Sequence, residues 1–389
     1  MHPRRPPRSR HQRVGGLPAW VYPALGVFCV FLLYVNSSVF FSSSSSTSSL
    51  RASAGERHRI PDGVVSLRDT THCHNALPSS TLEVFEASME TPTEDDPTKL
   101  SWQYRLKNLA VMKSATFVDD AVLVLTVVKN EGAWGRGRTV QDYLSLLATF
   151  DYPSTKLSLG ILTSSLTEYS HLKQLFLRHV KFAQVTILFR DDFSTIAAST
   201  APTRKDRRRM LARYRNYALA QSLEPWHTHV VWLDADVVQV PPTLVSKMVL
   251  AKKDILQPLV HVQGTTTDFE QSAWTGTRKT PSPDDVAFMH EAPGQGFEPG
   301  DGQVRHMNDL RGEEFPPLDS VGASMLYVKA DIHRQGVLFA THHVIGSEWK
   351  HEGYDGIETE GLCYVAGMLG YECRAMPQAI VYHSAPIPL

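Results

Sequence analysis

The sequence predicts a single open, mostly parallel α/β sheet with helices on both faces. Short apolar runs rich in β-branched residues recur along the chain, and amphipathic segments separate several of them. Strands and helices that alternate in this way form a sheet covered on both sides. The chain has 389 residues, of which 42% are hydrophobic, so it is long and apolar enough for a large core.

The apolar runs locate the strands. The first run, AVLVLTVV, is bounded by polar residues, as expected for a strand buried on both faces. Residues with helical spacing locate the helices, and the third is the longest. Strands are predicted at 121–128, 156–162, 184–189, 229–233, 254–260, 323–328 and 379–382, and helices at 139–150, 168–181 and 207–223. Residues 264–317 are rich in Gly, Pro, Ser and Thr, which predicts a binding loop or insertion.

The N-terminal part predicts a membrane anchor. Five arginines lie within the first 13 residues, the first acidic residue is Glu56, and residues 17–41 are almost entirely apolar. Such a stretch reaches the roughly 20 residues needed to cross a bilayer, and its basic flank stays in the cytosol. We therefore predict a cytosolic tail at 1–16, a transmembrane signal anchor at 17–41 and a lumenal remainder. The alternative, a cleaved signal peptide, is disfavoured because the apolar stretch is long and no cleavage site stands out.

Residues 42–100 are predicted to form a stem, and residues 101–389 the lumenal domain. The stem begins with SSSSSTSS, which cannot build a core. Cys73, Cys363 and Cys373 would then lie in a compartment where disulfides persist. Cys363 and Cys373 could form a disulfide or remain two buried thiols, and the sequence leaves both possibilities open.

The overall charge gives no support to nucleic-acid binding. The chain has 39 basic and 40 acidic residues, so it has no strong positive field. A phosphate-bearing ligand would have to be held by a local group of residues. In an open α/β sheet such a group is expected at the carboxyl ends of the strands.

Asp234 and Asp236 are the strongest candidates, because they directly follow the predicted strand 229–233. Carboxylates on alternate residues suit Mg²⁺ or Mn²⁺, and one or two suffice when diphosphate oxygens and water fill the other positions. Such an ion would also neutralise charge on a departing nucleoside diphosphate. The motif by itself is equally compatible with a solvated turn.

Other polar residues occupy comparable positions. Asn130 lies in a turn after the first predicted strand, where a nucleotide could approach. Arg209, Arg213 and Asn216 share one face of the third helix and could reach a diphosphate. His383 follows the last predicted strand, where it could bind a metal or serve structure alone.

Three acidic residues could orient a sugar hydroxyl or help it to react, namely Asp319, Glu358 and Glu360. Asp319 precedes the predicted strand 323–328, and the other two open a helix. For Glu358 there is a second explanation, since an acidic residue in the first turn of a helix offsets the helix dipole.

Six blocks of the sequence resemble the fungal mannan-polymerase mannosyltransferases of the Anp and Van type, in the order found in that family. The resemblance covers about two thirds of the chain, from residue 121 onward, and its blocks are 130–144, 209–219, 230–245, 318–336, 358–371 and 380–383. It implies a GT-A glycosyltransferase fold, GDP-mannose as donor and Mn²⁺ or Mg²⁺. It also implies α-1,6-mannan elongation on mannose-terminated N-glycans, at the Golgi membrane and in hetero-oligomers with related subunits.

The same resemblance assigns roles to the candidates. It makes Asp234 and Asp236 the motif for metal and diphosphate, and His383 a further metal ligand. It places Asn130, Arg209, Arg213 and Asn216 around the nucleotide, with Asp234. It assigns Asp319, Glu358 and Glu360 to positioning of the acceptor or donor sugar, and it matches Asp268 and Trp274 only loosely.

An α-linked product from an α-linked donor means retention, by a covalent carboxylate intermediate or by same-face attack, and the sequence does not choose between them. Two alternative functions are compatible with the sequence. A strand that ends in Asp-x-Asp also occurs in haloacid-dehalogenase-like phosphotransferases, where it would normally open its domain. A subunit of a mannan polymerase complex could also be a non-catalytic scaffold.

Overall fold

The computed structural model describes residues 81–90, 101–113, 119–178, 181–191, 203–292, 297–300 and 302–385. The predicted cytosolic tail, the predicted span at 17–41 and the serine-rich segment lie outside these residues. Within the described part of the chain, no helix combines the length and the apolar character that a membrane crossing requires.

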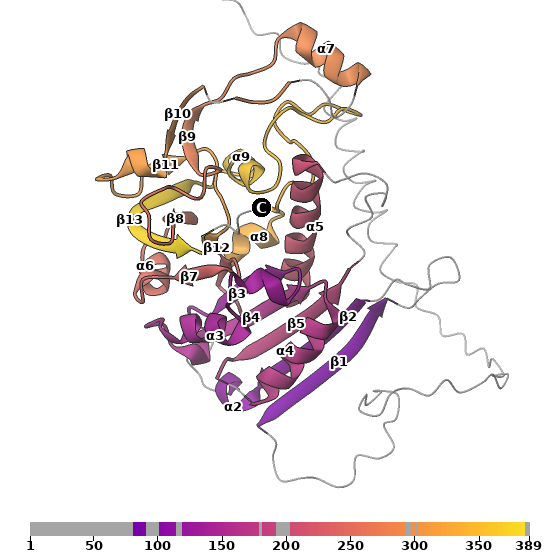
Figure 1. Cartoon of the computed structure of the whole chain (residues 1–389), viewed down its shortest axis with the longest axis vertical. Coiled ribbons are helices and arrows are strands. Elements are labelled where there is room, and N and C mark those ends of the chain that lie inside the picture. Colours follow the sequence, from indigo (N-terminus) through magenta and orange to yellow (C-terminus); the bar gives the residue numbers. More distant parts are fainter. Residues whose placement is uncertain are drawn as a thin grey trace, which may run out of the picture. The chain divides into compact units, whose positions relative to one another are not determined.

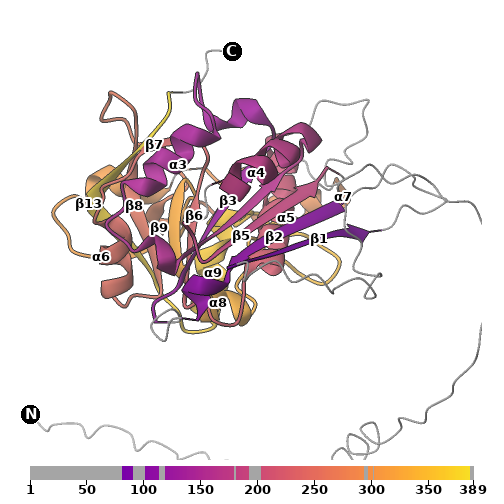
Figure 2. The ribbon, with the colours of Figure 1, turned by 90° about the horizontal axis from the view of Figure 1, so that it is seen from below.

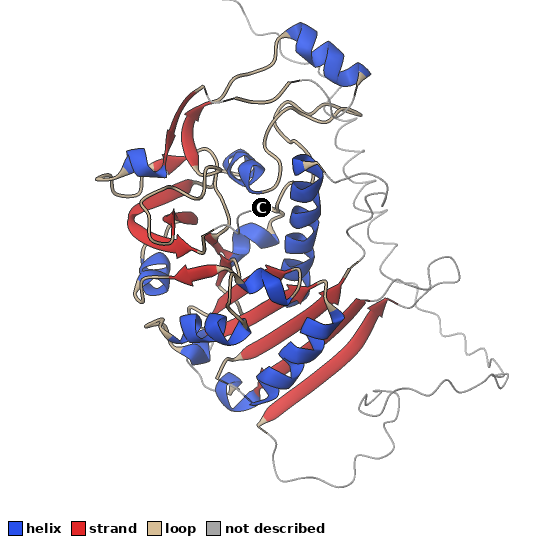
Figure 3. Cartoon of the chain, viewed as in Figure 1, coloured by secondary structure: helices blue, strands red, loops and turns tan. Residues whose placement is uncertain are grey.

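The described chain alternates strands and helices (Figures 1 and 3). The strands are β1 Leu82–Glu90, β2 Ser101–Asn108, β3 Val122–Val128, β4 Leu157–Thr163, β5 Gln184–Arg190, β6 His229–Leu233, β7 Val237–Gln239, β8 Ile255–Val262, β9 Trp274–Thr277, β10 Gln303–His306, β11 Pro317–Leu318, β12 Met325–Lys329 and β13 Cys373–His383. The α-helices are α2 Leu109–Met112, α3 Val140–Ala148, α4 Leu166–Arg178, α5 Arg204–Ser222, α6 Leu244–Leu250, α7 Pro283–Glu291, α8 Ala330–Arg334 and α9 Leu362–Met368. The 3-10 turns are η1 Glu131–Trp134, η2 Ser154–Lys156, η4 Met307–Leu310 and η5 Thr359–Gly361.

One large sheet organises the domain, in the order β1-β2-β5-β4-β3-β6-β12-β8-β13-β11, with β7 paired to β13. Its centre, β5-β4-β3-β6, is parallel, as predicted from the apolar runs. Antiparallel partners flank this centre, because β2 pairs with β5 and β12 lies antiparallel between β6 and β8. The sheet is therefore mixed. The insertion at 264–317 contributes the separate two-stranded pair β9 and β10.

Helices cover both faces of the sheet, as predicted, and each face has its own core. One core packs α3, α4 and α6 against the sheet through Tyr143, Phe176 and Met248. The other packs α5 and α9 through residues such as Ala218 and Leu362. Figure 2 shows α3 and α4 on one side of the strands and α8 on the other.

The prediction that residues 42–100 form a stem is corrected for the C-terminal part of that segment. Leu82–Glu90 is a strand, β1, which pairs antiparallel with β2. Both strands were absent from the prediction, because polar residues interrupt their sequences and neither contains a continuous apolar run. The folded domain thus includes residues before 101.

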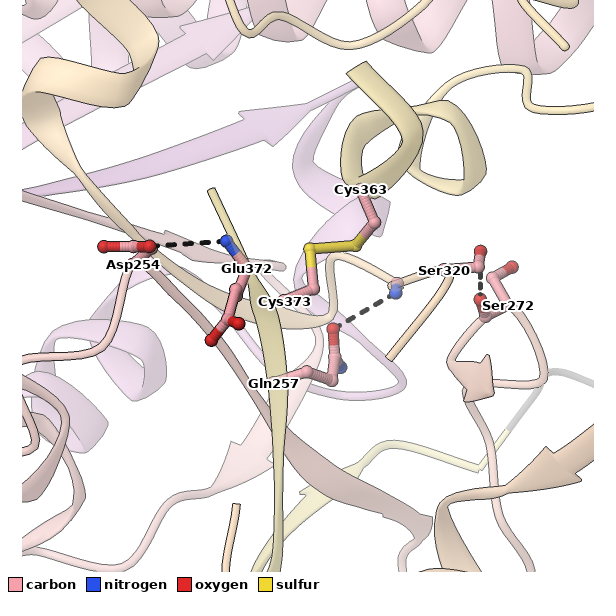
Figure 4. Close-up of a disulfide and its surroundings, with 8 residues drawn as sticks. Asp254, Gln257, Ser272, Ser320, Cys363, Glu372 and Cys373 are labelled. Carbon is pink, nitrogen blue, oxygen red and sulfur yellow. Dashed lines mark hydrogen bonds between the residues drawn. A yellow bond between two sulfur atoms is a disulfide. The ribbon is translucent and has the colours of Figure 1, made fainter. Parts of the chain in front are cut away.

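A disulfide joins Cys363 at the start of α9 to Cys373 at the start of β13, with their Cα atoms 5.8 Å apart (Figure 4). Of the two possibilities that the sequence left open, the structure has the bridge. Next to it, Asp254 accepts the backbone N–H of Glu372 at 3.3 Å. The bridge fastens α9 to the sheet, immediately after the loop that contains Glu358 and Glu360.

Candidate functional site

The Asp234-Ala235-Asp236 motif lies where β6 ends, at the carboxyl edge of the central parallel strands. The backbone N–H of Asp234 donates to Ser324 O at 2.9 Å, which joins the motif to the chain just before β12. Ala235 is buried, whereas the side chains of Asp234 and Asp236 are 32% and 33% exposed. Both carboxylates are held by buried backbone and remain within reach of a ligand.

Asp236 forms an ion pair with His383 at the end of β13. Their Oδ1 and Nε2 atoms are 2.9 Å apart, and Nδ1 of His383 lies 2.8 Å from Ser384 O. The ring of Phe269 stacks on the imidazole at 3.7 Å. Burial lowers the pKa of His383, but the hydrogen bond and the charge of Asp236 oppose it, and the net shift is upward. These contacts therefore hold the imidazole in position beside Asp236.

Asp234 is bound by Arg215, a buried arginine of α5. Nη2 of Arg215 is 3.1 Å from Asp234 Oδ1, and Nη1 contacts Glu358. Burial raises the pKa of Asp234 to about 6, with Arg215 opposing the rise and Asp236 and Glu270 adding to it. Three carboxylates thus share this corner of the site, and their repulsion favours either a proton or a cation there.

The ion pairs continue beyond Glu358. Arg208 lies 3.4 Å from Glu358 and 3.1 Å from Glu360. Arg278, in the 264–317 insertion, lies 3.3 Å from Glu360 and 3.1 Å from Asp355. We call the whole chain of contacts the charge ladder, and its members in order are Asp234, Arg215, Glu358, Arg208, Glu360, Arg278 and Asp355.

Glu270 supports the motif from the other side. Its Oε2 accepts from the backbone N–H and the hydroxyl of Ser324, at 3.1 and 2.7 Å. Gly322 lies so close to Glu270 that a Cβ atom there would be 1.8 Å from the Glu270 carboxyl carbon. A side chain at this position would displace the Glu270 carboxylate from Ser324.

The structure brings together five of the predicted site residues, namely Asp234, Asp236, His383, Glu358 and Glu360. Asn130 lies two residues after β3, the parallel neighbour of β6, and its side chain accepts from Gly132 N at 3.1 Å. It therefore faces the same edge of the sheet as the motif.

Four other predicted residues are placed differently. Arg209 forms an ion pair with Glu352, and Arg213 is exposed on α5. The side-chain amide of Asn216 donates to the backbone carbonyl of Phe339 at 2.8 Å and accepts from its backbone N–H at 3.0 Å. Asp319 is exposed and accepts from Thr275 Oγ1 and Gly276 N, at 3.0 and 2.8 Å. The contacts of Arg209, Asn216 and Asp319 bind one part of the domain to another.

A different face of α5 from the one that the sequence singled out makes the ion pairs with the motif and Glu358. Arg208 and Arg215 are seven residues apart and therefore lie on the same face, which points to Glu358 and Asp234. The position of Arg215 in the sequence could have indicated this face. Arg215 lies between Ala212 and Ala218, which are both fully buried. An arginine in an apolar stripe needs buried carboxylate partners.

Asp234, Asp236 and His383, the predicted metal ligands, are not arranged as a complete set of ligands in the structure. Among the described residues, no group of three Asp, Glu, His or Cys side chains is arranged to hold a metal ion. Asp236 and His383 are adjacent, but Asp234 is turned toward Arg215. Carboxylate oxygens with one imidazole nitrogen are nevertheless donors that suit Mn²⁺, and the repulsion at Asp234 fits a cation.

A groove of about 470 Å³ lies beside the motif, between α3 and the strand β7. Arg138 lines it and donates to Ala235 O at 3.3 Å and to Trp134 O at 3.0 Å. A second pocket of about 310 Å³ lies between α6 and β13. Neither of these two pockets is lined by Asp234 or Asp236.

Fold and site together define the class of the protein. It is an α/β protein with a mixed sheet that gathers carboxylates, a histidine and buried arginines at the ends of its central parallel strands. The chain belongs to the Anp1 family, whose model matches residues 101–343. The family predicted from the sequence blocks is thereby confirmed.

Similar proteins carry related names. The mannan polymerase complex subunit MNN9 of Candida albicans is 28% identical over 313 residues, which cover 72% of this chain and 79% of the relative. The mnn9 subunit of Schizosaccharomyces pombe is 27% identical, over 68% of this chain and 80% of its own. Among solved structures, the mannosyltransferase PcManGT from Pyrobaculum calidifontis has a TM-score of 0.40 and 14% identity, over 68% of this chain and 57% of that chain.

Proposed function

We propose that the chain is a metal-dependent glycosyltransferase of the GT-A type, which transfers mannose from GDP-mannose in the synthesis of mannan. The observation that carries the proposal is the position of Asp234 and Asp236, two partly exposed carboxylates at the carboxyl end of β6. Ligands of open α/β sheets bind at this edge. Membership of the Anp1 family and the names of the relatives supply the sugar and the polymer.

Asp236, His383 and Asp234 would hold the Mn²⁺ or Mg²⁺ ion. When bound, the ion supplies positive charge to a leaving nucleoside diphosphate. For Asp234 to take part, its carboxylate has to be shared with Arg215 or released from it. Because burial and two neighbouring acids raise the pKa of Asp234, its anionic form gains from a cation nearby.

Glu358 and Glu360 are assigned a positioning role in place of the catalytic role predicted from the sequence. Each forms ion pairs with two arginines, so neither carboxylate is available to a substrate hydroxyl. Through Arg215, Glu358 instead fixes the orientation of Asp234. Asp319, bound to Thr275 and Gly276, has no contact with this group.

The cellular setting follows the sequence and the relatives. We propose that the segment 17–41 anchors the protein in the Golgi membrane, with the α/β domain in the lumen. The relatives are named as subunits of mannan polymerase complexes, so the chain would act in a hetero-oligomer with related subunits on mannose-terminated N-glycans, extending an α-1,6-linked backbone. Retention applies, by same-face attack or by a covalent intermediate.

A second function, a non-catalytic scaffold, is favoured by one observation. Asp234 is paired with Arg215, and no three-ligand metal group is preassembled among the described residues. A phosphotransferase of the haloacid-dehalogenase type is disfavoured, because there the Asp-x-Asp strand opens the domain. Here the strands β1 to β5 precede β6.

The test is the Asp236→Asn variant of the full-length chain. We expect it to fold normally and to lose both GDP-mannose turnover and Mn²⁺-dependent binding of GDP. Asp331→Asn is the matched control, because the side chain of Asp331 is 81% exposed and lies on α8. Unchanged turnover in the Asp236 variant refutes the assignment. Tight binding of GDP without turnover, in both wild type and control, identifies the scaffold, and phosphatase turnover identifies the phosphotransferase.

A further inference from the structure

The chain between residues 340 and 358 forms a narrow hairpin with a tryptophan at its tip. Three antiparallel bridges define it, joining Ala340 to Glu358, Ile345 to Asp355 and Glu348 to His351. The last bridge is closed by two backbone hydrogen bonds of 3.1 and 3.0 Å. Trp349 and Lys350 therefore form a two-residue turn, in which Lys350 has a φ of 73°.

Trp349 is the most exposed of the large hydrophobic side chains in the described chain, at 88%. The hairpin that holds it is well anchored. Glu352 binds Lys205 at 3.1 Å and also Arg209, both on α5. On the opposite side, the ring of His351 stacks on His290 of α7 at 3.7 Å. An exposed indole on a fixed turn offers a rigid flat surface at little cost in conformational entropy.

The base of the hairpin is part of the candidate site. Glu358 closes the first bridge and belongs to the charge ladder that ends at Asp234, and Asp355 is the last member of the same ladder. Trp349 and Glu358 are nine positions apart in the sequence, so the tip lies at most about 30 Å from Glu358 along an extended strand. A ligand that touches both the site and the tip has to be an extended chain.

We propose that Trp349 is a binding platform for the acceptor oligosaccharide, contacting a sugar several units away from the residue that reacts. This inference rests on the proposed glycosyltransferase function and extends it to the length of the acceptor. The face of an indole carries negative charge density, and the C–H groups on one face of a sugar ring carry the complementary positive density. Hexoses bind aromatic side chains in this way.

The surroundings of the tip favour an uncharged sugar over a protein partner. Glu348 and Lys350 flank Trp349 with opposite charges, and Glu352 is neutralised by the two basic side chains of α5. No strong local field is left to select a charged partner. A single indole also covers one sugar ring, whereas a stable protein interface buries roughly 1,200 Å² or more.

The test compares acceptors of two lengths, an α-linked mannose disaccharide and an octasaccharide, with the full-length chain, Mn²⁺ and GDP-mannose. We expect Trp349→Ala to raise the KM for the octasaccharide about three- to tenfold, the range expected for loss of one aromatic contact. The KM values for the disaccharide and for GDP-mannose should stay unchanged. Trp349→Tyr should retain most of the affinity for the octasaccharide, because it keeps an aromatic face.

Leu250→Ala is the matched control, since Leu250 is 74% exposed at the end of α6. An unchanged KM for the octasaccharide in Trp349→Ala overturns the proposal, and so does an equal rise for both acceptors. Loss of partner subunits from a pull-down, with normal KM values, assigns Trp349 to a protein interface instead. If the wild-type chain transfers no mannose, the proposed function fails. Calorimetric titration then measures the affinity of the octasaccharide for wild type and for Trp349→Ala. Weaker binding to the variant supports the role of Trp349, and equal binding overturns it.

Discussion

Replacement of Arg215 by methionine should destabilise the domain more than any single surface change. Arg215 is 5% exposed, lies 3.1 Å from Asp234 and contacts Glu358, whose side chain is 8% exposed. Methionine fills a similar volume but leaves both carboxylates without their shared cation. Removing one partner of a buried ion pair costs about 3–5 kcal/mol, because a buried charge is left uncompensated. The cost here should lie in this range, and most of it should come from Glu358.

A second substitution distinguishes the contributions of Glu358 and Asp234 to the loss of stability. Glu358→Gln in the Arg215→Met background removes the more buried charge, while Asp234, 32% exposed, is still solvated in part. We expect this double variant to recover about 1.5 kcal/mol or more of the lost free energy of unfolding, a coupling typical of residues in one ion-pair network. Urea unfolding followed by tryptophan fluorescence measures all the variants.

The matched control is Arg305→Met. Arg305 also binds a glutamate, Glu313, but its side chain is 52% exposed, so the expected loss is within about 1 kcal/mol. The reasoning is refuted if Arg215→Met costs no more than this control. It is also refuted if Glu358→Gln fails to recover stability, since the penalty would then not come from an uncompensated charge.

Two more predictions concern stability. Burial lowers the pKa of His227 to about 3, well below the ordinary histidine value of 6.5. The unfolded chain therefore binds more protons than the folded one, and stability falls as the pH drops below 6.5. His227→Asn keeps an acceptor for Glu224 N–H and should remove about 2 kcal/mol of the stability lost between pH 7 and pH 5, as measured by urea unfolding; an unchanged pH dependence would contradict this. The double change Cys363→Ser and Cys373→Ser opens a loop with a sequence separation of 10 and should cost about 2–3 kcal/mol, measured against wild type with and without reductant. If reductant lowers the stability of wild type and of the double variant equally, the bridge is not the cause.

Much of the fold could be predicted because buried parallel strands leave an unambiguous pattern. The apolar runs at β3, β4 and β6 correspond to strands that are buried almost throughout, and each was found. The edge strand β1 was missed, since its residues are partly exposed and its composition is polar. Strand direction was also beyond reach, because the apolar run of β12 is the same whether it lies parallel or antiparallel to β6.

The site divides in a similar way. Asp234, Asp236 and His383 could be placed near one another from the sequence because they lie at or just after the ends of strands, and such ends meet at one edge of a sheet. The ion pairs of α5 were not predicted, because spacing along a helix defines a face but does not say what that face contacts. Arg209, Arg213 and Asn216 were chosen, whereas the ion pairs with Glu358 and Asp234 belong to Arg208 and Arg215. The partner glutamates come from a loop more than 100 residues away, which no local pattern can locate.

The charge ladder is a costly way to hold a domain together, because well-packed apolar residues of similar volume often stabilise as much or more. Its composition suggests another reason for its presence. It contains four carboxylates and three guanidinium groups, and Glu270 and Asp236 lie at the end near Asp234. Asp236 is in contact with His383, and Arg215 pairs with Asp234. A ladder of this composition both orients Asp234 and leaves negative charge where a divalent cation would bind, which an apolar core could not do.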